Sequence, residues 1–207
     1  GRRSRSGRAA AEAATAADAG FESLSGFREA FFKVFGGPAG KADQAQAIHM
    51  AWIETPLGPM VGGSNGSALV FLEFTNRRMM EAQIETLGKR FKAGFVPKDD
   101  DIIGQTRREL DEYFASRRKA FSVPIAFPGT PFETKVWNQL VKVPYGATIS
   151  YEDLAMRIGS KGAVRAVGSA NGRNRISILV PCHRVVNKSG ALGGYGGGLW
   201  RKEALLS

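Results

Sequence analysis

The chain has 207 residues, of which 43% are hydrophobic, and it contains one cysteine. No apolar run approaches the roughly 18 residues that a membrane-spanning helix needs, so the composition predicts a disulfide-free, cytoplasmic protein without membrane spans. Lysine and arginine number 29 against 19 acidic residues, a formal charge of +10. Such a surplus is typical of a protein with a polyanionic partner, although a solubilising surface gives the same sign.

The positive charge is concentrated toward the C-terminus. Residues 128–207 carry 11 basic and 4 acidic side chains, residues 44–127 carry 11 and 10, and residues 1–43 carry 7 and 5. The three segments also differ in their hydrophobic patterns. We therefore expect three units with these boundaries, and we expect the polyanionic partner at the last of them.

The first segment contains the stretch GFESLSGFREAFFKVFGGP, residues 20–38. Phe27, Phe31, Val34 and Phe35 are spaced for one apolar helix face, and the glycines and proline that follow end the helix. An isolated amphipathic helix explains this pattern. The residues also resemble the second helix-turn-helix of AraC-type regulators, but the first helix-turn-helix of that unit is missing. The resemblance implies a partial AraC-type segment and linker over residues 1–43.

The second segment, residues 44–127, opens with strand-like runs between residues 48 and 74, separated by Pro-Leu-Gly and Asn-Gly turn signals. Helix-like stretches follow at Arg77–Phe91 and Asp101–Ser116, and Val123–Phe127 is a short strand candidate. Strands followed by helices predict a small α+β unit. No residue here indicates chemistry, and His49 is interpreted as an ordinary strand residue.

The third segment, residues 128–207, begins with a predicted helix over Pro131–Lys142. Ser150 and Asp153 form a capping-box-like start for a second helix, Tyr151–Ile158. A turn through Gly159 leads to a third helix, Lys161–Asn171. Two short helices joined by a tight turn predict a helix-turn-helix.

The last helix of this pair has an unusually smooth surface. The residues expected to pack fall at i, i+3, i+4 and i+7: Ala163, Ala166, Val167 and Ala170. Arg165 and Ser169 then point outward, with Gly168 beside them. Readers of the major groove carry several long polar side chains, whereas one arginine on a Gly/Ala/Ser surface suits a narrow groove and insertion into the base stack. A plain packed helix with one solvated arginine is the alternative.

The single cysteine, Cys182, follows the apolar run Ile176–Val180, which we expect to be a strand that ends at Pro181. A lone cysteine is commonly an inert buried residue. Here His183 could act as a base, directly or through water, and nearby arginines would favour the thiolate: Arg165, Arg173, Arg175 and Arg184. No second cysteine can resolve an oxidised one, and no cluster has metal-ligand spacing, so we expect no metal, no structural zinc and no cofactor.

The stretch SGALGGYGGGLW, residues 189–200, has six glycines around Tyr195. A run of this kind is either a flexible loop or a segment that brings backbone N–H groups close to a ligand. Its position after a candidate nucleophile favours the second interpretation.

Several of these residues occur together in one known family. The chain has Tyr151, Arg165, Asn174, the pentapeptide PCHRV at 181–185 and Gly193–Tyr195 in the order and spacing of the O6-alkylguanine-DNA alkyltransferases, or methylated-DNA–protein-cysteine methyltransferases. The resemblance extends from about Ile48 to the end, and the AraC-like segment makes it Ada-like. It implies an α+β fold with a small RNase H-like strand/helix domain and a mostly helical domain that carries a helix-turn-helix.

The resemblance also implies a mechanism. The recognition helix enters the minor groove of double-stranded DNA bearing O6-alkylguanine, and the damaged base flips out, because its O6 is unreachable in the duplex. Arg165 fills the gap, and Tyr151 crowds the adjacent phosphate and donates to the guanine ring. Cys182 takes the alkyl group once and irreversibly, while His183 relays its proton through water. Asn174 braces the turn between the recognition helix and the cysteine.

The pocket for the flipped base is implied in the same way. Carbonyls near Cys182 and Val185 would accept from the guanine amino group, and the backbone N–H of Gly196 would face O6. The implied DNA contacts are Arg165, Tyr151, Ala163, Ala166, Ser169 and Gly168. The implied pocket residues are Val185, Tyr195, Gly196, Gly197 and Asn171. A monomer is expected, and O4-alkylthymine is an open second substrate.

Two departures from the family pattern leave alternatives open. A glutamate beyond the final helix completes the cysteine, histidine and water network in the family, and it has no counterpart among these 207 residues. Gly196 stands where some members carry serine, although its backbone donor is unchanged. The alternatives are a non-catalytic binder of alkylated DNA and an Ada-like transcriptional regulator of the alkylation response in which Cys182 is a sensor.

Overall fold

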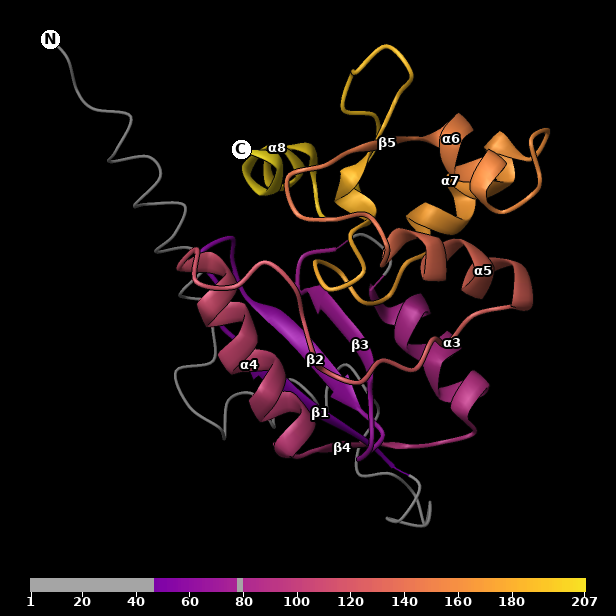
Figure 1. Ribbon diagram of the computed structural model, residues 1–207. Coiled ribbons are helices and arrows are strands. Elements are labelled where there is room, and N and C mark those ends of the chain that lie inside the picture. Colours follow the sequence, from indigo (N-terminus) through magenta and orange to yellow (C-terminus); the bar gives the residue numbers. More distant parts are fainter. Residues whose placement is uncertain (1–46, 78–79) are drawn as a thin grey trace, which may run out of the picture. The chain divides into compact units, whose positions relative to one another are not determined.

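The computed structural model describes residues 47–77 and 80–207, all within one unit, Lys41–Ser207 (Figure 1). The expected AraC-type segment, residues 1–43, lies outside these described residues. Within them, strands come first along the chain and most helices later. The fold is α+β, as the sequence predicted.

A four-stranded sheet forms the first half. Strands β1 (Ile48–Ile53), β2 (Met60–Ser64) and β3 (Leu69–Phe74) pair antiparallel in sequence order. The Pro-Leu-Gly and Asn-Gly turns predicted between them are present, and Gly58 and Gly66 have φ angles of +105° and +87°, which favour glycine. Every residue of β2 and β3 is buried, so these strands read as apolar runs rather than alternating patterns.

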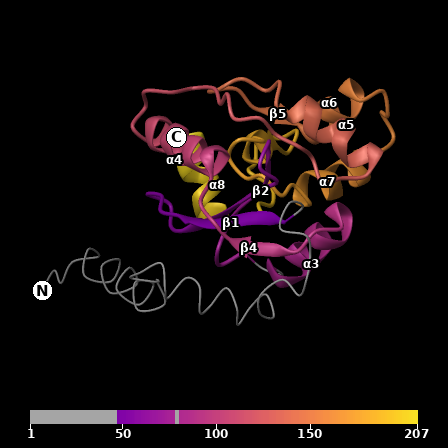
Figure 2. The same cartoon turned by 90° about the horizontal axis from the view of Figure 1, so that it is seen from below.

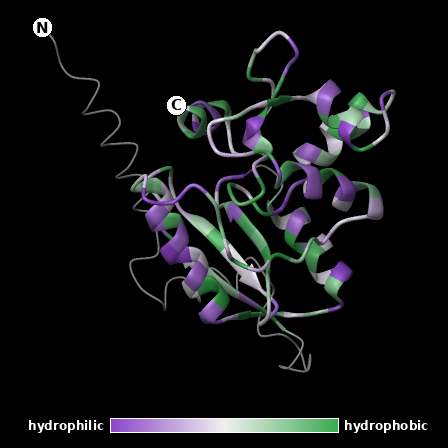
Figure 3. Ribbon diagram, viewed as in Figure 1, coloured by the Kyte–Doolittle hydropathy of each residue, from purple (hydrophilic) through white to green (hydrophobic). Residues whose placement is uncertain are grey.

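A fourth strand, β4 (Phe95–Pro97), pairs parallel with β1 and makes the order β3-β2-β1-β4. Three residues that end in proline gave no strand signal in the sequence. The helix before it, α3 (Met80–Phe91), and the helix after it, α4 (Asp101–Phe114), match the two predicted helices with small changes of bounds. Helix α4 packs on β2 and β3, and Figure 3 shows hydrophilic residues on its outer side.

His49 was interpreted as an ordinary strand residue, but its side chain pairs with a helix cap. Its Nδ1 lies 2.6 Å from Oδ2 of Asp100, which is the N-cap of α4. The other carboxylate oxygen of Asp100 accepts from the Ile103 backbone N–H over 2.9 Å. This pair therefore joins β1 to the start of α4 and stabilises the helix N-terminus.

The predicted strand Val123–Phe127 is wrong. Only Ile125 makes a ladder contact, a parallel bridge with Leu69, in which Leu69 N donates to the Pro124 carbonyl and Ala126 N donates to Leu69 O. Pro124 has no N–H to donate, so the ladder cannot extend. The segment instead crosses as irregular chain.

The second half is mostly helical. Helix α5 (Pro131–Leu140) begins with a capping box between Thr130 and Glu133. Strand β5 (Ile149–Ser150), helix α6 (Tyr151–Arg157) and helix α7 (Val164–Gly172) follow, and the Ser150 hydroxyl accepts from Asp153 N, as predicted. Helices α5, α6 and α7 pack on one another and lie together at one side of Figure 2. The expected helix-turn-helix is α6 and α7.

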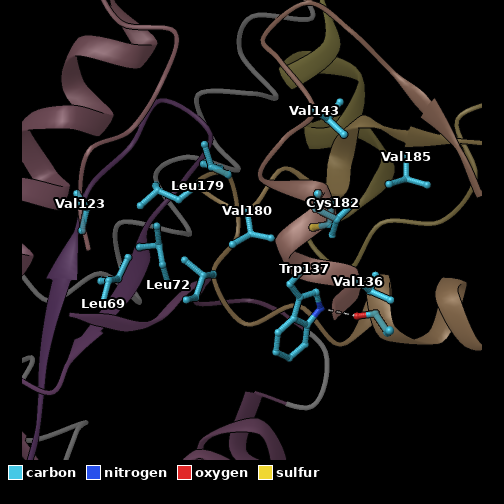
Figure 4. Packing of buried hydrophobic residues seen from close by; sticks show 14 of the residues in the cluster. Leu69, Leu72, Val123, Val136, Trp137, Val143, Leu179, Val180, Cys182 and Val185 are labelled. Carbon is cyan, nitrogen blue, oxygen red and sulfur yellow. Dashed lines mark hydrogen bonds between the residues drawn. The ribbon is translucent and has the colours of Figure 1, made fainter. Parts of the chain in front are cut away.

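The chain ends with the 3-10 helix η2 (Cys182–Arg184), strand β6 (Val185–Val186), which pairs parallel with β5, and helix α8 (Leu199–Leu206). One apolar cluster runs from Leu69 and Leu72 on β3 through Trp137 on α5 to Val180 and Cys182 (Figure 4). Trp137 is 2% exposed, and its Nε1 donates to the Ala170 carbonyl over 2.8 Å. The cysteine therefore lies at the edge of the core that joins both halves.

Among residues 47–77 and 80–207, no helix is both long and apolar enough to cross a membrane.

Candidate active site

The segment before Cys182 is a tight turn, so the predicted strand Ile176–Val180 is wrong. Ile176 makes a single parallel bridge with Leu72, and the chain then reverses: Val180 N donates to Ile176 O over 3.0 Å. Ile178 adopts a φ of +73°, which is strained for a β-branched residue. All five residues of the run are buried, and burial alone does not distinguish a strand from a turn.

Asn174 holds this turn around the cysteine. Its Nδ2 donates to Cys182 Sγ over 3.1 Å and to Val180 O over 3.0 Å, while its Oδ1 accepts from Ile176 N over 3.0 Å. Asn174 is 1% exposed and Cys182 is 4% exposed. One amide therefore fixes the turn and also presents a hydrogen-bond donor to the sulfur.

Burial raises the pKa of the Cys182 thiol above its usual value, and the Asn174 hydrogen bond lowers it in part. The cations that most favour the thiolate are Arg77 and Lys202, while Glu73 opposes it. None of the four arginines expected to provide this field is among these charges, and Arg175 is half-buried. Arg165 and Arg173 are exposed, and the guanidinium of Arg184 donates to the Val143 carbonyl over 2.8 Å.

His183 is fully buried beside the cysteine in η2. Burial, with the charges of Arg184 and Lys202, lowers the pKa of its imidazole to about 3, so the ring is neutral at neutral pH. Neither ring nitrogen has a hydrogen-bond partner among the described residues. A ring with so low a pKa does not keep a proton at neutral pH, so it can only pass one on.

Tyr151 lies between the recognition helix and the glycine-rich stretch. A Cβ built on Gly168 would lie 3.8 Å from its ring, and one built on Gly193 would lie 3.5 Å from its hydroxyl. Burial and the charge of Cys182 raise the pKa of Tyr151, so its hydroxyl keeps its proton. Gly193 has a φ of +64°, which favours glycine, and it brings the glycine-rich stretch against the Tyr151 ring.

The carbonyl groups of the expected base pocket already have donors. Cys182 O accepts from Val185 N and from Asn171 Nδ2, the latter over 3.4 Å. Val185 O accepts from Lys202 Nζ over 2.6 Å. Each carbonyl oxygen has two lone pairs, so Val185 O can still accept from a base amino group, whereas Cys182 O already has two donors.

The glycine-rich stretch forms the other wall. The Tyr195 hydroxyl is buried, burial raises the pKa of this phenol well above its usual value, and the ring centroid lies 6.4 Å from that of His183. Gly197 is buried and its carbonyl accepts from Arg201. Gly196 is exposed, which leaves its backbone accessible to a ligand.

The recognition helix α7 buries a narrower stripe than predicted. Val167, Ala170 and Asn171 are buried and Ala163 is half-buried, but Ala166 is exposed, so its assignment to the packing face is wrong. The helix starts at Val164 rather than Lys161. Asn171 belongs to the buried stripe with Val167 and Ala170, at i, i+3 and i+4, and the centre of this stripe lies away from Ala166. The exposed side carries Gly162, Arg165, Ala166, Ser169 and Arg173. This side combines small residues with two cations.

Two family models match the chain. The ribonuclease-like domain of 6-O-methylguanine DNA methyltransferase matches residues 48–127, and the DNA-binding domain of 6-O-methylguanine DNA methyltransferase matches residues 131–207. The chain belongs to the 6-O-methylguanine DNA methyltransferase family. The resemblance read from the PCHRV motif and its partners is thereby confirmed.

Relatives in this family cover most of both chains. The methylated-DNA–protein-cysteine methyltransferase of Mycobacterium bovis is 43% identical over 159 residues, 77% of this chain and 90% of the relative. The constitutive methylated-DNA–protein-cysteine methyltransferase of Bacillus subtilis is 49% identical over 153 residues, 74% of this chain and 89% of the relative.

Solved structures agree with the family fold. The crystal structure of Mycobacterium tuberculosis OGT in complex with DNA superposes with a TM-score of 0.65 at 40% identity, covering 76% of this chain and 90% of that one. The O6-methylguanine-DNA methyltransferase from Pyrococcus kodakaraensis gives a TM-score of 0.52 at 27% identity, covering 77% and 96%. The ribonuclease-like first domain and the helical DNA-binding second domain are both present.

Three further side chains belong to this methyltransferase site, and the sequence did not indicate them. Lys202 is fully buried on α8, and Glu73 and Arg77 form a buried ion pair behind the cysteine. A glutamate inside the apolar run LVFLEF, with an arginine four residues later, was the available signal. In the part of the chain that the structure describes, no group of three or more histidine, cysteine or acidic side chains could hold a metal.

Proposed function

We propose that this methyltransferase repairs double-stranded DNA by moving an alkyl group from O6 of guanine to the Cys182 sulfur. The observation that carries the proposal is the buried Cys182 thiol, which receives a hydrogen bond from Asn174 over 3.1 Å within the family's PCHRV motif. A donor to sulfur favours the thiolate, which is the nucleophile. Alkylated DNA is the partner, and the protein acts as a monomer.

In the reaction, the bond between O6 and the alkyl carbon breaks and a bond between that carbon and Sγ forms. His183 relays the thiol proton through water, and the departing guanine finally gains one proton, so charge is balanced without a cofactor. The product is a thioether. Nothing in the chain can cleave the new carbon–sulfur bond, so each molecule acts once.

The base must leave the DNA duplex before Cys182 can reach it, because the sulfur is buried at the edge of the core. The small residues exposed on α7 allow close approach to the minor groove, and Arg165 fills the space that the base leaves. Tyr151 sits between α7 and Gly193, where it can turn the nucleotide and donate to the base. Asn171, Val185, Tyr195, Gly196 and Gly197 line the base pocket.

We place the reaction in the cytoplasm, because a protein that spends a free thiol on each lesion requires a reducing compartment. We also propose that O4-alkylthymine is a poorer substrate than O6-alkylguanine, since thymine has no exocyclic amino group to donate to the Val185 carbonyl.

The test is mass spectrometry of the intact protein and its peptides after incubation with a duplex containing one O6-methylguanine. One methyl group on the peptide that bears Cys182, in proportion to the lesion lost, supports the proposal. Cys182→Ser is the control and should bind the duplex but gain no methyl group. If the lesion is bound and no methyl group moves, the chain is a binder of alkylated DNA and not a repair protein.

A further inference from the structure

The turn that carries Asn174 is docked at both ends onto β3. Leu72 N donates to Arg175 O over 2.8 Å, and Ser177 N donates to Leu72 O over 2.7 Å. These two bonds form the parallel bridge between Leu72 and Ile176. The residue that donates to the reactive sulfur therefore has its position set by the first domain.

Side chains of the first domain add a second attachment. Glu73 on β3 is fully buried and pairs with Arg77, which follows β3 and is 8% exposed. Arg77 Nη2 donates to the Gly172 carbonyl, the last of α7, over 2.6 Å. The Ser177 hydroxyl donates to the Glu73 carboxylate, with distances of 2.9 and 3.0 Å to the two oxygens. Arg77 thus holds the start of segment 172–177 and Glu73 holds its end.

Arg77 also contacts the glycine-rich wall of the pocket. A Cβ built on Gly196 would lie 2.7 Å from the Arg77 Cζ atom, so the guanidinium occupies the space that any side chain at this position would need. One guanidinium therefore lies between the C-terminus of α7 and the loop expected to face the alkylated oxygen. Its displacement would affect both walls of the pocket.

Stability alone is a weak reason for this ion pair. A buried pair loses hydration that its mutual attraction often fails to restore, and apolar replacements of similar size are frequently neutral or stabilising. The Glu73 carboxylate is nevertheless fully satisfied, by Arg77, Ser177 and the Phe74 backbone N–H at 3.1 Å. Fully bonded polar networks of this kind define one geometry.

We propose that Glu73 and Arg77 are positioning residues for alkyl transfer: they hold segment 172–177 so that the Asn174 amide faces the Cys182 sulfur. The proposal goes further than the proposed function and rests on it only for the identity of the alkylated base that Cys182 attacks. The effect on the sulfur passes through Asn174. It is therefore distinct from the direct field of the two charges.

The thiol is surrounded by titratable groups from several elements, and each can influence its pH profile. They are Glu73 and Arg77 from the first domain, Tyr151 from α6, Tyr195 from the glycine-rich stretch, Lys202 from α8 and the adjacent His183. Glu73 and Arg77 act on the thiol in opposite directions, so removing both leaves a small direct effect. Any further change in the pH profile of the double variant therefore reports the loss of positioning.

Two variants isolate the positioning effect. Ser177→Ala removes one bond of the network without changing any charge, and the double variant Glu73→Gln, Arg77→Met removes both charges together. The matched control is Ser64→Ala, because Ser64 is also fully buried and its hydroxyl also hydrogen-bonds a carboxylate, that of Asp100. Ser64 lies on β2 and does not touch segment 172–177.

The readout is the rate of Cys182 alkylation by iodoacetamide against pH, measured on the full chain beside thermal unfolding and single-turnover transfer from an O6-methylguanine duplex. We expect the midpoint of the pH profile to rise in both variants. At pH 7 the rate should fall about threefold in Ser177→Ala and about tenfold in the double variant. Ser64→Ala should leave rate and midpoint unchanged.

Two results would overturn the proposal. One is an unchanged rate and midpoint in Ser177→Ala and in the double variant, even if both unfold at lower temperature, because the network would then be only structural. The other is an equal slowing by Ser177→Ala in wild type and in an Asn174→Ala background, because the effect would then bypass Asn174. If wild type is alkylated by iodoacetamide but takes no methyl group from DNA, the proposed function fails while the positioning test remains valid.

Discussion

Asn174 donates a hydrogen bond to the sulfur of Cys182 over 3.1 Å, and the same amide nitrogen also donates to Val180 O over 3.0 Å. The donor is fixed by the turn it holds together, so it does not need to reorganise when charge develops on the sulfur. The pKa of the thiol is raised by burial. This hydrogen bond therefore lowers the pKa of a thiol whose burial favours the unreactive, protonated form.

Replacing this donor should make the thiol less reactive. In Asn174→Ala, the pKa of Cys182 should rise further, and methyl transfer at pH 7 should slow by about tenfold or more, because a hydrogen bond to a charged group contributes about 1.5–3 kcal/mol. Single-turnover rates against pH measure both effects. Asn138→Ala is the control, since Asn138 is exposed on α5. An unshifted midpoint in Asn174→Ala would show that the sulfur does not depend on this donor.

The sequence predicted the elements with clear local signals. Helix α6 was found because its cap, Ser150 with Asp153, is a local pattern, and α5 begins at the predicted Pro131. The two wrong strands, at Val123 and Ile176, each make one ladder contact, which apolar pattern alone cannot distinguish from a strand. Burial of Ala166 was overestimated because the apolar pattern left out the polar Asn171, which is buried and moves the centre of the packed stripe away from Ala166.

The residues of the site were predicted only where they lie close together in the sequence. Cys182, His183 and Asn174 lie within nine residues of one another in sequence, and the structure brings them together. Glu73 and Arg77 are far away along the chain and reach the cysteine through β3, which pairs with the turn at Leu72. No local pattern encodes such a contact, because it depends on how the two domains pack.

Arg165 should matter for duplex substrate and not for the free base. Its side chain is exposed on α7, away from the buried sulfur, so it can affect chemistry only by keeping the base out of the stack. In Arg165→Ala, transfer from an O6-methylguanine duplex should slow about tenfold or more, since unstacking a base costs a few kcal/mol. Transfer from free O6-methylguanine should not change.

The matched control is Lys161→Ala, another exposed cation just before α7, which should weaken duplex binding slightly at low salt only. Equal slowing of duplex and free-base transfer by Arg165→Ala would exclude the proposed role in base flipping and indicate damage to the pocket itself.

His183 should make folding stability depend on pH. The pKa of its imidazole is about 3 when folded and near 6.5 when unfolded. Between these values the unfolded chain binds more protons, so the free energy of unfolding falls as the pH drops below 6.5, by up to about 1.4 kcal/mol per pH unit. His183→Gln removes this contribution. Urea unfolding between pH 4.5 and 7 should therefore show a smaller slope in the variant, and parallel curves would mean that the ring is not buried as a neutral group.

Lys202 should stabilise the pocket rather than the helix that carries it. Its ammonium group donates to Val185 O over 2.6 Å, to Leu192 O and to Gly194 O over 3.3 Å, so one cation joins β6 to the glycine-rich stretch. Lys202→Met keeps the length of the side chain but leaves these buried carbonyl groups without their donor. The free energy of unfolding should fall by about 2 kcal/mol or more.

Alkyl transfer should also slow in Lys202→Met, because Lys202 is one of the cations that lower the pKa of Cys182. Lys188→Met is the control, as Lys188 is exposed in the same part of the chain and should change neither property. Urea unfolding and single-turnover transfer separate the two effects. If Lys202→Met unfolds and reacts like wild type, the three carbonyl groups find other donors. The glycine-rich wall of the pocket is then held by the Arg77 guanidinium and by the chain itself.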